Sequence, residues 1–146
     1  MEYLYVPNLH NNLSAAWFSG CANLKYLYGG FSHISRAFDF YTYSYVPGHI
    51  EEIWLPDCSY IYNLTFRSCE SLMKLYLLST SVVKLANKNA FTLTPMSNST
   101  YTGNFGSIYV PASLVNTYKT ATNWATYSAR IVGYEEEEPP AVEDDS

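Results

Sequence analysis

Residues 50–56, IEEIWLP, carry the pattern that decides the fold: apolar side chains at the first, fourth and sixth positions, closed by a proline. The same frame recurs, in whole or in part, in residues 1–7 (MEYLYVP), 24–28 (LKYLY), 72–77 (LMKLYL) and 107–111 (SIYVP). Its central apolar residues lie 23, 26, 22 and 33 positions apart. Periods of this length are typical of stacked repeats. We therefore expect about five similar units, each beginning with one strand.

A second phrase recurs in phase with the first. Residues 18–24 and 66–72 share the spacing Phe-x-x-Cys-x-x-Leu, and the Ala-Phe pairs at 37–38 and 90–91 are weaker echoes. A single unit cannot bury its apolar side alone, so neighbouring units must stack. We expect the Phe and Cys side chains to fill the interior from the wall opposite the strands. The polar stretch 97–104 accounts for the long fourth spacing as an insertion.

The pattern changes after Pro111. Residues 112–119 and 123–130 read as two short helices, the second capped by Thr122 or Asn123. We expect a repeat stack over residues 1–111, a helical C-terminal cap over residues 112–134 with Gly133 ending the fold, and an acidic disordered tail over residues 135–146. The tail is either a solubilising end or linker, or a contact with a basic neighbour.

Charge and hydropathy exclude two classes of partner. The net charge is −5, but seven of the 13 acidic residues lie in the tail, which leaves the body with a charge of about +2. Nucleic-acid binding requires clustered Lys and Arg, so we expect no nucleic-acid partner. The apolar runs are too short to cross a bilayer, and no signal peptide is recognisable at the start.

The outward strand positions are the candidate binding site. Successive strand residues alternate between faces, so Ile53 and Leu55 point inward and Trp54 points outward. The equivalent outward positions hold Tyr5, Tyr28, Trp54, Tyr76 and Tyr109, and the flanking outward positions hold Tyr3, Tyr26, Glu52, Lys74 and Ser107. This pattern predicts an aromatic ladder on one face. Such a ladder either binds a glycan or protein, or serves to stabilise adjacent units.

The residues quoted above resemble the BspA-like leucine-rich repeats of bacterial and phage-encoded surface proteins. Residues 50–56 and 66–72 match best, and residues 106–131 look like the ending often found on such proteins. The resemblance covers about residues 1–134 and implies an α+β solenoid, a short leucine-rich repeat stack closed by a helical cap. The departures are Gly29-Gly30, where a proline would fall, and the Tyr-rich segment 38–45, which lacks the cysteine.

Metal and thiol chemistry is not expected. His10 and His33 are one repeat apart and are predicted to stack, but no short-spaced pair of ligands exists. Cys21 and Cys69 are equivalent positions two units apart, roughly 9–10 Å, which is too far for a disulfide. Cys58 follows Pro56 in a loop and is expected to be a free thiol. We predict no metal and no cofactor.

The resemblance implies binding and no reaction, since members of the family mostly bind macromolecules and many are adhesins. We expect a non-enzymatic recognition module on a phage virion or bacterial cell surface, attaching to host surface material. The alternative is a structural virion protein whose faces are buried against other subunits. A glycan hydrolase would need paired carboxylates, and the candidates are Glu51, Glu52, Asp57 and Glu70.

The N-terminal end of the stack lacks an obvious cap. Without one, the first unit would expose apolar surface and an unpaired strand edge. Three explanations are open: residues 9–17 fold over it, a second copy or larger assembly covers it, or the chain is part of a longer protein.

Overall fold

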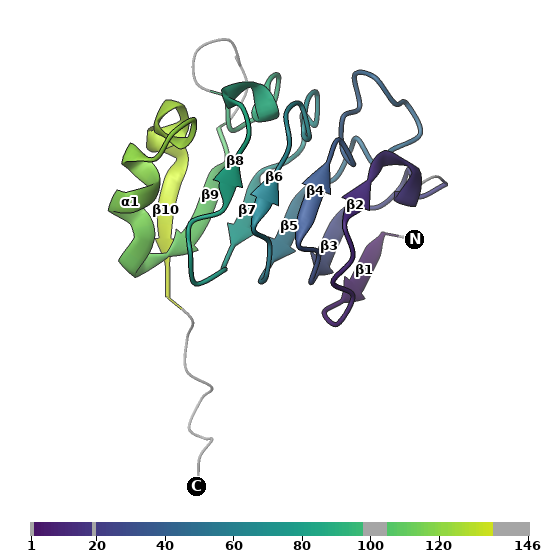
Figure 1. The fold of residues 1–146 in the computed structure, drawn as a ribbon. Coiled ribbons are helices and arrows are strands. Elements are labelled where there is room, and N and C mark those ends of the chain that lie inside the picture. The colour runs from purple at the N-terminus through teal and green to yellow at the C-terminus, as the bar shows by residue number, and fades with distance from the viewer. Residues whose placement is uncertain (1, 19, 98–104, 136–146) are drawn as a thin grey trace, which may run out of the picture.

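Two parallel sheets face each other, and the chain passes from one to the other in each successive unit (Figure 1). This computed structural model describes residues 2–18, 20–97 and 105–135. The six-stranded sheet has the order β1 (Tyr3–Val6), β3 (Tyr26–Gly29), β5 (Glu52–Leu55), β7 (Lys74–Leu77), β9 (Ser107–Pro111), β10 (Ile131–Tyr134). The four-stranded sheet has the order β2 (Leu13–Ser14), β4 (His33–Ser35), β6 (Tyr60–Ile61), β8 (Lys84–Leu85). With the short helices described below, the arrangement is a repeat-like α+β fold.

The predicted strand register is confirmed. The central apolar residues pair in one row across the large sheet, in the order Leu4, Leu27, Ile53, Leu75, Ile108. The expectation of one strand in each unit is wrong, because four of the units contribute a second strand to the smaller sheet. Most of these strands have two residues, which is too short for alternation to show in the sequence.

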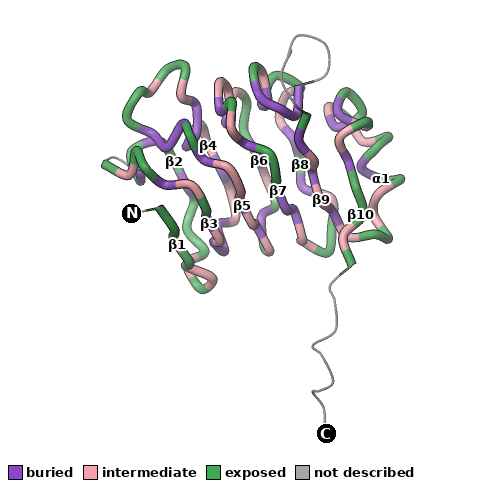
Figure 2. Tube along the Cα trace, turned by 180° about the vertical axis from the view of Figure 1, so that it is seen from behind, coloured by how far each residue is buried: buried purple, intermediate pink, exposed green. Residues whose placement is uncertain are grey.

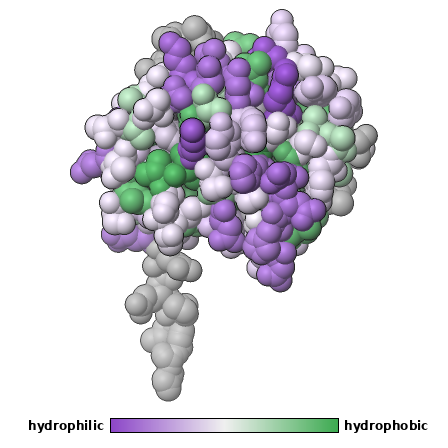
Figure 3. Space-filling view, viewed as in Figure 1, coloured by the Kyte–Doolittle hydropathy of each residue, from purple (hydrophilic) through white to green (hydrophobic). Residues whose placement is uncertain are grey.

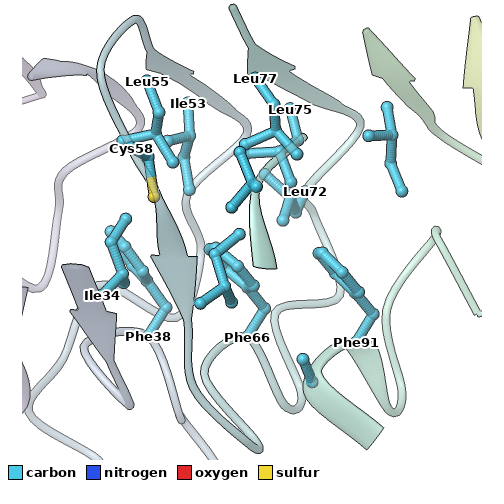
Figure 4. Packing of buried hydrophobic residues seen from close by; sticks show 14 of the residues in the cluster. Ile34, Phe38, Ile53, Leu55, Cys58, Phe66, Leu72, Leu75, Leu77 and Phe91 are labelled. Carbon is cyan, nitrogen blue, oxygen red and sulfur yellow. The ribbon is translucent and has the colours of Figure 1, made fainter. Parts of the chain in front are cut away.

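The second phrase forms the interior column that its phase predicts. Phe38, Phe66 and Phe91 are fully buried and lie parallel, with ring centroids 5.5 and 5.1 Å apart and interplanar angles of 10° and 5°. Phe18 continues the column, 5.3 Å from Phe38. Figure 4 shows Phe38, Phe66 and Phe91 facing the inward side chains of β5 and β7 across the core. The Ala-Phe echoes are therefore members of the same column.

The strand register is preserved at Gly29-Gly30, where a proline would fall in the repeat, because the side chain of Phe31 fills the space that Gly29 leaves. Gly29 pairs with Val6 in the ladder, at a position where β5 has the inward Leu55. A Cβ on Gly29 would lie 2.3 Å from the ring of Phe31, which is fully buried and fills that space. A Cβ on Gly30 would lie 2.4 Å from the carbonyl oxygen of Pro7. Close packing therefore requires both glycines.

The C-terminal cap has two helical segments and an additional strand. Residues Ala112–Leu114 and Val115–Thr120 form a 3₁₀ turn (η3) followed by helix α1, and Trp124–Arg130 form a 3₁₀ helix (η4). Residues Ile131–Tyr134, expected within a helical cap, instead form β10 parallel to β9. Of the two expected caps, Thr122 and Asn123, Asn123 occupies the N-cap position of η4, but it has φ 68° and its side chain makes no capping hydrogen bond.

The cap closes the outer edge of β8 with side chains. The Trp124 indole N–H donates to the Val83 carbonyl at 2.7 Å, and the Asn123 amide donates to the Leu85 carbonyl at 2.7 Å. The backbone N–H of Val83 donates to the Tyr118 hydroxyl at 2.8 Å. Figure 3 shows apolar residues gathered between β8 and α1, where the cap meets the smaller sheet. These bonds satisfy backbone groups that a further strand would otherwise pair.

Both sheets end in an edge strand on the N-terminal side. Among the described residues, β1 neighbours β3 alone and β2 neighbours β4 alone. Of the three explanations for the N-terminal end, one had residues 9–17 fold over the first unit; in the structure Leu13–Ser14 form β2, the first strand of the smaller sheet, and Ala15–Phe18 form a 3₁₀ turn (η1) after it. Figure 2 shows β1 more exposed than the strands behind it in the stack.

Two predicted segments fall largely outside the description. Of the acidic tail, residue Glu135 is described; of the polar insertion 97–104, Ser97 is described. Residues Lys88–Phe91 form a further 3₁₀ turn, η2, capped by the Asn87 side chain, and the Tyr-rich segment is a loop between β4 and β5.

Candidate functional site: the aromatic face of the six-stranded sheet

The five predicted outward aromatics form one continuous row. Tyr5 pairs with Tyr28, Tyr28 with Trp54, Trp54 with Tyr76, and Tyr76 with Tyr109 in the strand register. Their ring centroids are 5.0, 6.1, 3.7 and 4.5 Å apart in that order. The flanking row begins with Tyr3 and Tyr26, whose rings are 6.4 Å apart, and continues with Glu52, Lys74 and Ser107.

The C-terminal half of this row is closed by a residue that the sequence analysis did not include. Tyr134, on β10, packs edge-on against Trp54 and Tyr76, with ring centroids 5.8 and 5.6 Å away. Tyr76 lies between Trp54 and Tyr109 and is 8 % exposed. Burial, followed by the charge of Glu52, raises the pKa of Tyr76. This half therefore packs as an aromatic cluster, with little surface left on Tyr76 for a ligand.

The N-terminal half is open. Tyr3, Tyr5 and Tyr26 are 62 %, 59 % and 37 % exposed. A depression of about 300 Å³ lies over strands β1, β3 and β5, and its lining residues are Tyr3, Tyr26, Leu27, Tyr28, Glu52 and Trp54. A second depression of about 440 Å³ adjoins it through Tyr26 and Glu52 and continues toward Lys74. We refer to the first depression as the aromatic pocket.

Two carboxylates flank the aromatic pocket with different partners. Glu51 accepts from the Lys25 ammonium at 3.4 Å and from the Tyr26 hydroxyl at 3.3 Å. The charge of Glu51 and this hydrogen bond raise the pKa of Tyr26. Glu52 instead accepts a hydrogen bond of 2.5 Å from the indole N–H of Trp54. This hydrogen bond helps to orient the Trp54 ring, and it uses one of the two oxygens of the Glu52 carboxylate.

The histidines do not stack on each other as expected. His33 lies on Tyr60, with centroids 5.9 Å apart and planes 20° apart. His10 Nδ1 lies 3.1 Å from the Gly30 carbonyl oxygen and 3.9 Å from Asp57. Within residues 2–18, 20–97 and 105–135, no three His, Cys, Asp or Glu side chains converge as a metal site would require.

The three cysteines are free thiols in different surroundings. Cys21 is partly exposed, whereas Cys58 and Cys69 are buried. Cys58 lies in the loop between β5 and β6, as expected, but its side chain packs into the core, and burial raises its pKa to about 12. The Cys69 thiol donates to the Phe38 carbonyl at 2.9 Å, and burial raises its pKa as well. Both buried thiols are poor nucleophiles as a result.

A buried ionic cluster of Arg36, Asp39 and Arg67 anchors the Tyr-rich loop, and the sequence pattern did not predict it. Asp39 is fully buried and accepts from the guanidinium groups of Arg36 at 2.8 Å and Arg67 at 3.1 Å. Burial favours a higher pKa for Asp39, but the hydrogen bonds from the two arginines outweigh it and the pKa is lowered. Through Arg67, which also donates to the Thr42 hydroxyl at 2.7 Å, the cluster ties the Tyr-rich loop to the following unit.

No protein-family model matches the chain, and no curated protein matches its sequence. Among the described residues, no helix has both the length and the apolar character needed to cross a membrane.

Proposed function

We propose that this chain is a non-enzymatic recognition module, a leucine-rich repeat solenoid of the BspA-like type, that binds a protein or a surface glycan. The binding face is the N-terminal half of the aromatic row. The observation that carries this proposal is the exposure of Tyr3, Tyr5 and Tyr26 beside the aromatic pocket. Contiguous exposed apolar surface of this kind marks interaction sites on soluble proteins.

The sheet supports binding because it holds the rings in place before a ligand arrives. Each ring lies on a strand that is paired on at least one side, and each packs against a neighbouring ring, as Tyr5 does against Tyr28 with ring centroids 5.0 Å apart. Side chains that are already ordered lose less conformational entropy on binding. The flat faces suit the apolar side of a sugar ring or a partner's side chains, and the hydroxyls add hydrogen bonds.

The setting that we propose is a phage virion or bacterial cell surface, where the module attaches to host surface material. This proposal rests on the resemblance of residues 50–56 and 106–131 to BspA-like repeats. Catalysis is not part of it: of the four candidate acids, Glu51 is engaged by Lys25 and Tyr26 and Glu52 by Trp54, so these two have local roles in holding the face.

The test compares two double variants on a glycan array and on immobilised host cell-envelope material. Tyr5→Ser with Tyr26→Ser removes two rings from the open face. Tyr41→Ser with Tyr62→Ser removes two exposed tyrosines elsewhere and is the matched control. We expect the first pair to lose about fivefold to 150-fold in affinity, because each of the two lost aromatic contacts contributes roughly 0.5–1.5 kcal/mol. Equal binding by both variants, with unchanged circular dichroism, would contradict the proposal.

A second candidate, a structural assembly protein, is favoured by the edge of β1. Among the described residues this strand is paired on one side, and its inward Leu4 and Val6 are half-buried where Ile53 is fully buried. In an assembly, neighbouring subunits would cover both this edge and the tyrosines. Light scattering on the purified protein separates the two candidates: a concentration-independent monomer favours recognition, and a defined oligomer in which Tyr5 resists iodination favours assembly.

A further inference from the structure

The aromatic pocket combines four aromatic side chains with one carboxylate that has no cationic partner among the described residues. Its walls hold Tyr3, Tyr26, Tyr28 and Trp54, and its remaining polar group is Glu52. The ion pairs formed by the described residues do not include Glu52, whose carboxylate is bonded to the Trp54 indole.

The neighbouring lysines do not neutralise this carboxylate. Lys25 pairs with Glu51 at 3.4 Å. Lys74 is the register partner of Glu52 on β7 and lines the adjoining depression, but its ammonium lies beyond the 4.0 Å limit of an ion pair. A negative charge beside several aromatic rings favours a cation, because the face of an aromatic ring also carries partial negative charge.

From these contacts we infer that the aromatic pocket binds a trimethylammonium group carried by the ligand of the proposed recognition face. The inference rests on that proposed function and names its chemistry. A quaternary ammonium needs no hydrogen-bond acceptors, and aromatic cages are its usual receptor. A primary ammonium would bring three N–H donors to a pocket lined mostly by aromatic rings and Leu27, with the Glu52 carboxylate and tyrosine hydroxyls as acceptors, and any donor left unpaired is costly to desolvate. An anionic ligand would meet both Glu51 and Glu52.

The experiment follows the Trp54 indole N–H signal in a two-dimensional ¹H–¹⁵N NMR spectrum of the full chain, assigned with Trp54→Phe. This proton is a suitable reporter because it is bonded to Glu52 at the wall of the pocket. Choline is titrated against 3,3-dimethylbutan-1-ol, its neutral isostere of the same shape. Phosphocholine and a trimethyllysine peptide then present the same cation from a headgroup and from a protein.

We expect choline to bind about threefold to thirtyfold more tightly than its isostere, the range that cation–π contacts support. Glu52→Gln retains an acceptor for the indole and should remove this preference. Asp57→Asn is the charge-matched control, since Asp57 lies beside His10 and not among the pocket residues; it should retain the preference. Lys74→Gln should strengthen choline binding by removing a nearby like charge.

Equal affinity for choline and the isostere, or no saturable shift with phosphocholine and with the peptide, would overturn the inference. If the array in the preceding test still identifies a Tyr5- and Tyr26-dependent ligand, the proposed function stands while the trimethylammonium inference fails. If choline binds with the Glu52 dependence but the tyrosine variants bind host material normally, the inference stands and the proposed function fails.

Discussion

The hydroxyl of Tyr118 offers a direct test of how the cap closes the smaller sheet. Tyr118→Phe removes one oxygen atom and leaves the ring in place. Both Tyr118 and Val83 are fully buried, and the Val83 N–H donates to that hydroxyl at 2.8 Å. Burial raises the pKa of Tyr118 to about 12, so the native hydroxyl is neutral at ordinary pH. The variant therefore leaves a buried backbone donor without its partner.

The expected cost follows from that unsatisfied donor. Leaving a buried donor unpaired costs about 1–3 kcal/mol, so we expect the free energy of unfolding to fall by about 2 kcal/mol. For a domain of this size that corresponds to a melting temperature lower by about 6 °C. Urea titration monitored by tryptophan fluorescence measures the first quantity, and calorimetry the second. The Val83 amide should also exchange with deuterium faster than its neighbours in the core.

The matched control is Tyr62→Phe, the same chemical change at a tyrosine that is 40 % exposed. We expect it to change the free energy of unfolding by less than about 0.5 kcal/mol, as is usual for surface substitutions. If Tyr118→Phe and Tyr62→Phe unfold at the same urea concentration, the hydroxyl does not satisfy the edge of β8. The account of the cap given above would then be wrong.

Three other outcomes follow from buried groups. Phe66→Ala should cost about 3–5 kcal/mol in unfolding free energy, because it empties the centre of a fully buried ring column; urea titration measures it. The pKa of Asp39 is lowered in the folded state, so its stabilisation is present above the unfolded pKa of about 3.9 and is lost as the pH falls through the lower folded value. The difference in unfolding free energy between the native chain and Asp39→Asn should therefore shrink on acidification below pH ~4. Of the three thiols, Cys21 should react with Ellman's reagent in the native protein, whereas Cys58 and Cys69 should react after unfolding.

The sequence alone determined the repeated strand and its orientation. Alternation of apolar residues in 50–56 and its copies set which side chains face inward, and the recurring spacing set the register, because each unit can bury its apolar face by stacking on the next. The in-phase Phe positions likewise predicted the interior column. Local pattern sufficed for these features, since the same short-range geometry repeats in every unit.

Tertiary structure alone decided which part of the aromatic row stays open. Tyr134 lies far along the chain from Trp54 and Tyr76, and it reaches them because residues 131–134 add a strand beside β9. That strand follows a helical segment and does not repeat the apolar spacing of residues 50–56, so the sequence period did not predict it. The unpaired charge of Glu52 depends in the same way on where the Lys25 and Lys74 side chains point, which strand register leaves undetermined. The sequence therefore predicted the aromatic face, and packing between distant segments decided which part of that face stays exposed as the candidate site.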